Sequence, residues 1–319
     1  LIVKTSSMGD IVHALPLVSD IAANLPGARI EWVAEEGFAA IARLHPSVTR
    51  VVSVALRRWR KRLLSGDTWD EIRAAKQQLH DLPYDRVIDC QGLLKSAWIA
   101  RWSRGPRTGP DRASARESIA AAFYDQKVAI SRDLHAVERN RRLGAAAFGY
   151  AIDTPARFGL RVPRVTPGLV PTDRRYAVLL TNASRPTKLW GDDRWHALEA
   201  ALAAQGLRSL LFWGSPAESA ATQARAATMR DARVLPRVSL DVAAAVLAGA
   251  TVVVGLDTGL SHLAAAVGAP TVGIYCDYDP ALVGLVGDAP CESLGGVSAA
   301  PSAPAVIEAA ARVMAAVRV

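Results

Sequence analysis

A loop of small residues near the start of the chain is the first candidate for chemistry. It lies in LIVKTSSMGDIVHALP, where Ser7 and Gly9 would let the backbone approach a ligand closely. Asp10 follows where a helix is predicted to begin, so it is a candidate proton acceptor. A carboxylate there also caps free N–H groups, and both interpretations stay open. The loop lacks a dinucleotide fingerprint and a P-loop ending, which disfavours nicotinamide and ATP-hydrolysing enzymes.

A second loop, in VVVGLDTGLSHLAAA, is a candidate diphosphate site. An apolar strand ends at Gly255, and Gly259 opens a helix whose first N–H groups are unpaired and suit an anion. Asp257 could accept a bond from a sugar or ribose hydroxyl. The alternative is a capped helix with a satisfied histidine. The candidate donor residues in this loop are Asp257, Thr258, Gly259, Ser261 and His262.

Two further loops of the second half follow predicted strands. TNASRPTKLW places Ser184, Thr187 and Lys188 at one strand end, where a lysine could neutralise a phosphate. An ordinary surface lysine is the alternative. LFWGSPAES places Glu218 where it could accept a bond from a nucleoside hydroxyl. A glutamate at a helix start is equally common because the helix dipole favours it.

Basic residues concentrate in the first half of the chain. RRWRKR, residues 57–62, holds five cations and one aromatic residue, and Arg107, Arg112 and Arg116 follow on another predicted loop. A solvated charge run is the alternative, but a multiply anionic partner explains both clusters. Nucleic acid is disfavoured because the chain has no known nucleic-acid-binding motif. Gln91 at a strand end and His135 on a probable helix are further polar candidates, either of which could be purely structural.

Composition limits the class of protein. The chain has 319 residues, of which 50% are hydrophobic, and its net charge is +8. No run approaches the roughly 20 apolar residues that span a bilayer, and no leader pattern is visible. Cys90, Cys276 and Cys291 are widely spaced and form no zinc or disulfide motif. We therefore expect a cytoplasmic protein without a metal site.

Short apolar strands alternate with helical patterns along both halves, which predicts an α/β protein with two doubly wound, Rossmann-like domains. We expect the first domain at 1–160, a proline-rich linker at 161–174 and the second domain at 175–319. The last helix could pack back on the first domain. The two domains are expected to face each other across a cleft, with the candidate loops at the carboxyl ends of the strands.

Several motifs, taken in order, resemble the type I heptosyltransferase group of glycosyltransferase family 9. They are KTSSMGD, VAEEGF, RRWRK, DCQGLLKSA, HAVERN and DTGLSHLAAA, and they cover nearly the whole chain. The resemblance implies a GT-B fold and inverting, single-displacement transfer of L-glycero-D-manno-heptose from an ADP-heptose donor. The implied acceptor is the Kdo residue of Kdo-lipid A in the lipopolysaccharide inner core. No metal or other cofactor is implied, and peripheral contact with the anionic cytoplasmic face of the inner membrane follows.

The resemblance also implies roles for single residues. Asp10 matches the catalytic base, Lys188 a contact to the donor phosphate, and Glu218 a nucleoside contact. The basic acceptor face corresponds to Arg57, Arg58, Arg60, Lys61 and Arg116. Ser7, Gly9, Gln91 and His135 complete the candidate acceptor site.

One segment departs from the family pattern. In YCDYDP, Cys276 and Tyr278 replace a glycine and a threonine, which puts the shape of that donor-side loop in doubt. A family 9 transferase with another donor or acceptor, and a non-catalytic protein that binds a nucleotide or anionic glycan, remain the alternatives. Acceptor-dependent release of ADP would distinguish them.

Overall fold

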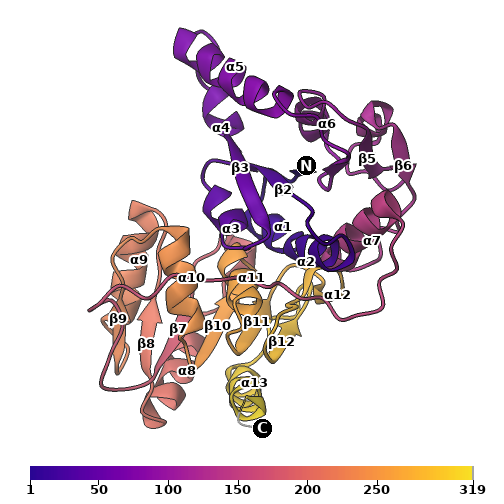
Figure 1. Cartoon of the computed structure of the whole chain (residues 1–319). Helices are drawn as coiled ribbons and strands as arrows, with labels where there is room; N and C mark the ends of the chain where they lie inside the picture. Colours follow the sequence, from indigo (N-terminus) through magenta and orange to yellow (C-terminus); the bar gives the residue numbers. More distant parts are fainter. Residues whose placement is uncertain (318–319) are drawn as a thin grey trace. The chain divides into compact units, whose positions relative to one another are not determined.

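The structure, a computed structural model, describes residues 1–317. Contacts within the chain divide it into two units, Leu1–Gly159 and Leu160–Val319. Each unit is built on its own six-stranded parallel sheet (Figure 1). None of the helices in the described part of the chain is long and apolar enough to cross a membrane.

The sheet of the first unit has the strand order β3-β2-β1-β4-β5-β6. Its strands are β1 (Ile2–Val3), β2 (Ile30–Glu35), β3 (Val48–Val54), β4 (Val87–Asp89), β5 (Arg107–Pro110) and β6 (Gln126–Val128). The order changes direction between β1 and β4, and open parallel sheets bind ligands outside the carboxyl ends of strands at such a point. The loops that carry Asp10 and Gln91 leave β1 and β4 there.

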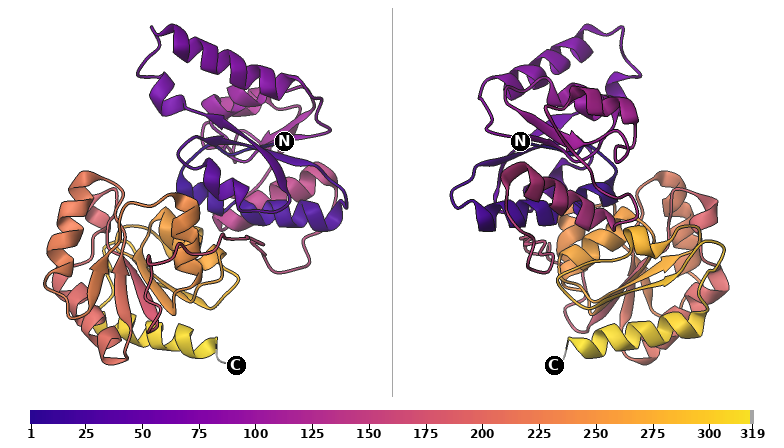
Figure 2. Two further views of the ribbon diagram at one scale, coloured as in Figure 1. Left: turned by 60° about the vertical axis from the view of Figure 1, so that its left-hand side comes forward. Right: turned by 90° about the vertical axis from the view of Figure 1, so that its right-hand side faces the viewer.

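Helices cover both faces of this sheet (Figure 2). They are α1 (Met8–Val12), α2 (Leu15–Asn24), α3 (Ala39–Arg43), α4 (Leu56–Trp59), α5 (Gly66–His80), α6 (Leu94–Ala100) and α7 (Ala136–Phe148), with a 3-10 helix η1 (Ser118–Phe123). Val3, Val33 and Val52 pack on one face against Trp59 of α4 and Leu79 of α5. Helices α2 and α7 pack against each other. The helices thereby fix where each strand-to-helix loop begins.

The second unit repeats this plan with the order β12-β11-β10-β7-β8-β9. Its strands are β7 (Tyr176–Leu180), β8 (Arg208–Leu211), β9 (Ala232–Val234), β10 (Val252–Leu256), β11 (Thr271–Tyr275) and β12 (Cys291–Gly295). The direction changes between β7 and β10, whose side chains are all buried. The loops that carry Lys188 and Asp257 leave these two neighbouring strands, which places both loops at one edge of the sheet.

The helices of the second unit are α8 (Asp192–Ala204), α9 (Pro216–Ala226), α10 (Leu240–Ala248), α11 (Gly259–Ala266), α12 (Pro280–Val283) and α13 (Ala303–Ala316), with a 3-10 helix η2 (Pro186–Lys188). The last helix, α13, contacts α8 and β11 of its own unit. Its predicted packing on the first domain stays a prediction. The segment 161–174 contains neither helix nor strand.

Candidate active site

The side chain of Asp10 is held by the loop that precedes it. Asp10 lies in α1, where its Oδ2 accepts hydrogen bonds from the backbone N–H of Ser7 at 2.9 Å and from the Ser7 hydroxyl at 3.0 Å. Within residues 1–317, no hydrogen bond reaches its other oxygen, Oδ1. The capping interaction is therefore present, and it leaves one carboxylate oxygen open to a ligand.

Positive charge surrounds the Asp10 carboxylate. The Arg116 guanidinium lies 3.6 Å from Oδ2, and the Asp10 side chain is 25% exposed. Burial raises the pKa of Asp10, but Lys4, Arg116 and the Ser7 hydrogen bonds more than offset this and hold it below its usual value. Asp10 is consequently ionised at neutral pH and able to accept a proton.

A buried hydrogen-bond network supports the loop from below. Gln91 accepts hydrogen bonds at its Oε1 from the backbone N–H and the hydroxyl of Thr5, both at 2.8 Å. The Gln91 backbone N–H in turn donates to Asp89 at 2.8 Å. Lys4 donates to the carbonyl of Cys90 at 2.7 Å. Gln91 therefore positions the loop before Asp10, and its predicted contact with an acceptor stays a prediction.

Sequence reasoning missed Asp89, at the carboxyl end of β4. Its fully buried carboxylate accepts hydrogen bonds from Ser96 at 2.8 Å and Tyr124 at 2.7 Å, besides the backbone N–H groups of Gln91 and Gly92. Burial raises the pKa of Asp89 despite these bonds. The available signal was an aspartate that ends an apolar strand two residues before Gln91. Its role here is to hold the β4 loop.

The six-residue basic cluster separates into two parts. Arg58 donates to both carboxylate oxygens of Glu36, at 3.2 and 3.0 Å, and to Glu71 at 2.8 Å. Glu71 also accepts from the indole of Trp59 at 2.6 Å. Arg58 is thus charge-compensated by two glutamates distant in sequence, and its predicted contact with an acceptor stays a prediction.

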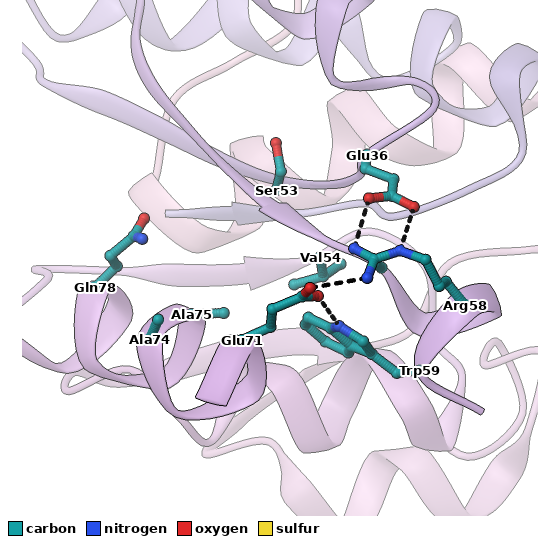
Figure 3. Close-up of a pocket in the computed structure, with 10 residues that line it drawn as sticks. Glu36, Ser53, Val54, Arg58, Trp59, Glu71, Ala74, Ala75 and Gln78 are labelled. Atoms are coloured by element: carbon teal, nitrogen blue, oxygen red, sulfur yellow. Dashed lines mark hydrogen bonds and ion pairs between the residues drawn. The ribbon is translucent and has the colours of Figure 1, made fainter. Parts of the chain in front are cut away.

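These residues line a pocket of about 260 Å³ between the end of β3 and α5 (Figure 3). Its lining includes Glu36, Ser53, Val54, Arg58, Trp59, Glu71, Ala74, Ala75 and Gln78. Figure 3 shows Arg58 between the two glutamates, with the Trp59 indole directed at Glu71. The pocket was not predicted, and the charged groups in its lining, Glu36, Arg58 and Glu71, already bond to each other.

The remaining cations of the acceptor prediction are exposed. No salt bridge to any residue among 1–317 is formed by Arg57, Arg60 or Lys61. The Arg57 guanidinium lies 5.4 Å from the centre of the Phe38 ring. Three positive charges on one short helix and its end thus remain available to an anion. Arg116, by contrast, lies beside Asp10.

His135 caps α7 and packs against another histidine. Its Nδ1 accepts from the backbone N–H of Val137 at 3.2 Å, and its ring lies edge-on to that of His13, with centroids 5.7 Å apart. His13 is buried and was not among the predicted residues. The helix cap is thus an observed role of His135, and acceptor contact stays a prediction.

In the second unit, the structure brings Lys188, Asp257 and His262 together. The Lys188 ammonium donates to the carbonyl of Asp257 at 3.1 Å and also to its carboxylate. The other carboxylate oxygen lies 3.4 Å from Nε2 of His262. Burial raises the pKa of Asp257, but hydrogen bonds to His262 and Lys188 outweigh it and lower the pKa below the usual value. The result is a largely buried, charge-balanced cluster at the switch point of the sheet.

The other donor-side residues lie on the same two loops. Ser261 donates to the carbonyl of Leu256 at 2.6 Å and lies 3.4 Å from the hydroxyl of Thr258. Gly259 is the first residue of α11, and Ser184 is exposed. The predicted loop is therefore shaped by its own hydroxyl groups before any ligand binds.

Glu218 belongs to a capping box at the start of α9. Its carboxylate accepts from the backbone N–H of Gly214 at 2.7 Å and of Ser215 at 3.2 Å, while the Ser215 hydroxyl accepts from the Glu218 N–H. The structural alternative considered for Glu218 is thus present. Its contact with a nucleoside stays a prediction.

Comparison with known proteins identifies the family. The family model described as glycosyltransferase family 9 (heptosyltransferase) matches residues 72–302. The chain belongs to glycosyltransferase family 9. It is 43% identical over 290 residues to lipopolysaccharide heptosyltransferase 1 of Escherichia coli K12, with 90% of both chains covered.

Solved structures confirm the predicted fold class. The chain matches the E. coli heptosyltransferase WaaC with ADP at a TM-score of 0.87 and 40% identity, covering 96% of this chain and 97% of that one. The same enzyme with ADP-2-deoxy-2-fluoro heptose matches at a TM-score of 0.85 and 39% identity, with the same coverage. The family 9 chain therefore has the GT-B fold of two Rossmann-like domains.

The segment that departs from the family pattern contributes a residue that sequence reasoning missed. Oδ2 of Asp277 accepts a hydrogen bond from the hydroxyl of Thr187 at 2.6 Å. The Arg185 guanidinium lies 3.7 Å from the same oxygen. The other oxygen of Asp277 is buried and has no hydrogen-bond partner among residues 1–317. Asp277, which lies between the two departing residues, therefore ties the Lys188 loop of this family 9 member to the end of β11.

Within the described residues of this family 9 chain, no group of three or more His, Cys, Asp or Glu side chains is placed to hold a metal ion. The cations near the candidate loops are side chains, namely Arg116 beside Asp10 and Lys188 beside Asp257.

Proposed function

We propose that this family 9 member is an inverting transferase. It moves L-glycero-D-manno-heptose from ADP-heptose to the Kdo residue of Kdo-lipid A, a step of lipopolysaccharide inner-core synthesis. The observation that carries the proposal is the 43% identity, over 90% of both chains, to a lipopolysaccharide heptosyltransferase 1. The matching E. coli enzyme has been solved with ADP and with a fluorinated ADP-heptose, which supports the donor class.

Asp10 is the general base of the proposed reaction. As the Kdo hydroxyl oxygen attacks the anomeric carbon, its proton passes to the Asp10 carboxylate. The bond between that carbon and the diphosphate oxygen breaks, and ADP leaves with the electron pair. The configuration inverts because the hydroxyl enters opposite the leaving group. The lowered pKa of Asp10 keeps it ionised but makes it a weak base, so proton transfer accompanies bond formation.

Lys188 stabilises the departing diphosphate. An ammonium group has three N–H donors, and two of them already bond to Asp257. The third is left for a phosphate oxygen, while the first N–H groups of α11 supply further donors. Asp257 holds Lys188 in place, and Lys188 together with His262 reduces the repulsion between Asp257 and the diphosphate. Neither a metal nor another cofactor is part of this mechanism.

The two domains divide the substrates in this proposal. The first, 1–160, binds the acceptor, whose phosphates and carboxylates meet Arg57, Arg60 and Lys61. The second, 175–319, binds the nucleotide sugar. A lipid acceptor places the enzyme peripherally at the cytoplasmic face of the inner membrane. There each basic residue near the anionic surface contributes about 1 kcal/mol to the free energy of membrane binding. Nucleic acid is not a partner.

A donor-by-acceptor activity matrix tests the proposal. ADP release should require both ADP-heptose and Kdo-lipid A and should fall to background when either is omitted. The product should carry one additional heptose of inverted anomeric configuration. Binding of ADP-heptose without acceptor-dependent ADP release would instead favour a non-catalytic binding protein. Release with a different sugar nucleotide or core acceptor would identify a family 9 relative of other specificity.

A further inference from the structure

The connection between α4 and α5, together with the first turn of α5, exposes an apolar surface. Leu63 is 51% exposed, Leu64 103% and Trp69 49%. We call these three residues the apolar tip. Scattered surface leucines need no explanation, but three large apolar side chains within seven residues form a local patch of the kind that marks a binding surface.

The apolar tip is held by its own hydrogen bonds. The indole of Trp69 donates to the carbonyl of Leu63 at 2.8 Å. Backbone bonds from Lys61 to Arg58 and from Ser65 to Arg62, both at 3.0 Å, close the turns on either side. Several polar backbone groups of the tip are thereby satisfied internally, which lowers the cost of moving the segment out of water.

The base of the tip is anchored to the first unit. Trp59 is buried and bonds to Glu71, while Arg58 links Glu71 of α5 to Glu36 beyond β2 (Figure 3). In Figures 1 and 2 the α4–α5 connection lies at the periphery of the first unit, beyond its sheet. An anchored, peripheral segment can insert without unfolding its support.

The charge next to the tip is strongly positive. Residues 57–69 contain five cations and one carboxylate, Asp67. Arg58 is paired with glutamates, whereas Arg57, Arg60, Lys61 and Arg62 form no salt bridge within residues 1–317. Leucines and a tryptophan beside unpaired cations match an anionic lipid surface, whose acyl boundary takes the apolar groups and whose phosphates take the charges. A nucleic acid would satisfy the cations but leave the leucines in water.

We propose that the apolar tip inserts into the headgroup and upper acyl region of an anionic bilayer, with the adjacent Arg62 on the lipid phosphates and Arg60 and Lys61 left to the acceptor. This inference deepens the membrane contact included in the proposed function, and it names the segment that makes it. Docking itself requires no sugar transfer. The tip would bring the acceptor face, whose lipid substrate is embedded in the same bilayer, to the membrane surface.

Vesicle partitioning tests the tip. The probes are phosphatidylcholine vesicles with and without phosphatidylglycerol, both lacking Kdo-lipid A, and bound protein is measured by sedimentation. Wild type should bind only the anionic vesicles. Leu63→Ser with Leu64→Ser should reduce partitioning by about tenfold with an unchanged melting temperature, because burial of each leucine is lost. The matched control is Val297→Ser, which removes an apolar side chain that is 66% exposed on the second unit and should change nothing.

Equal partitioning of wild type and the double variant would overturn the proposal, as would an equal loss in the Val297→Ser control. A second measurement separates this inference from the proposed function. With an acceptor stripped of its acyl chains, the double variant should keep the kcat/KM of wild type, whereas with vesicle-embedded acceptor it should lose activity. Absence of transfer by wild type to either acceptor, with anionic binding intact, would contradict the proposed function and leave the docking surface standing.

Discussion

Asp10 and Asp257 occupy the same kind of position in two different units. Each follows a short buried strand and has a pKa lowered below its usual value; Asp10 lies in the first turn of α1, and Asp257 lies two residues before α11. Their partners differ. Asp257 is 11% exposed and pairs directly with Lys188, whereas Asp10 is 25% exposed and its nearest cation, Arg116, lies 3.6 Å away. The neighbouring side chains, more than the strand-to-helix position, therefore decide whether a carboxylate orients a cation or keeps an oxygen open.

The largest expected effect comes from Asp10→Asn. Loss of a general base typically costs about 10²–10⁴-fold in rate, so kcat should fall by that order. The amide oxygen can still accept from Ser7, so the melting temperature and ADP affinity should stay nearly unchanged. Steady-state kinetics and thermal unfolding provide the measurements. If Asp10→Asn keeps its turnover while Asp10→Ala only loses stability, Asp10 acts solely as a helix cap.

Lys188→Ala should have the next largest effect. Hydrogen bonds to charged groups are worth roughly 1.5–3 kcal/mol, so ADP affinity in calorimetry should fall about 10–100-fold. Stability should also fall, because Asp257 loses the cation that balances it. A double variant, Lys188→Ala with Asp257→Ala, should recover stability without recovering ADP affinity. Unchanged ADP affinity in a folded Lys188→Ala protein would remove Lys188 from the donor site.

Neutralising Arg60 and Lys61 together tests the acceptor face. In Arg60→Gln with Lys61→Gln, the acceptor KM should rise several-fold and depend less on salt, because screening acts on those charges. ADP affinity should barely move. Arg58→Gln is the contrasting variant, since it leaves Glu36 and Glu71 without their shared partner and should lower stability. If the Arg60 and Lys61 variant lost ADP affinity while its acceptor KM stayed unchanged, the proposed division of substrates between the domains would be contradicted.

The smallest expected effect is a shift in pH dependence. Burial raises the pKa of Asp10, while Lys4 and Arg116 lower it more, so activity should persist below the usual aspartate value of about 3.9 before it falls. Arg116→Gln removes one cation and should move the acidic limb of kcat/KM to higher pH. The limb's position, measured from pH profiles, is independent of a uniform change in acceptor affinity. A limb that stays in place would show that Arg116 does not tune Asp10.

The pH dependence of stability should have the same sign for Asp10 and Asp257, because folding lowers the pKa of both carboxylates. A group whose pKa is lowered by folding stabilises the native state above its unfolded value, and the contribution is lost as the pH falls through the folded value. Asp10 and Asp257 should therefore stabilise the fold at neutral pH and cease to do so in acid. Chemical denaturation of wild type and Asp257→Asn across that range should converge at the acidic end.

The loops were predictable from the sequence because the signal is local. A buried strand followed by small and polar residues marks a strand-to-helix loop, and the parallel order then brings the Lys188 and Asp257 loops to neighbouring strands. The partners of Arg58 were not predictable. Glu71 and Glu36 lie 13 and 22 residues away, and their meeting depends on how α5 and the β2 loop are placed. The role of Asp89 was not predicted for the same reason, since its partner Tyr124 lies 35 residues away in the sequence.

The double pairing of Arg58 has a consequence for redesign. Its planar guanidinium contacts two carboxylates at once, a geometry that lysine cannot reproduce. Arginine is therefore required at this position for the double pairing that supports the first unit. No salt bridge within residues 1–317 holds Arg57, Arg60 or Lys61. Substitutions that change their charges should therefore leave the Arg58–Glu36–Glu71 interactions intact. The surface charge of the first unit can thus be changed at these three positions while the fold is kept.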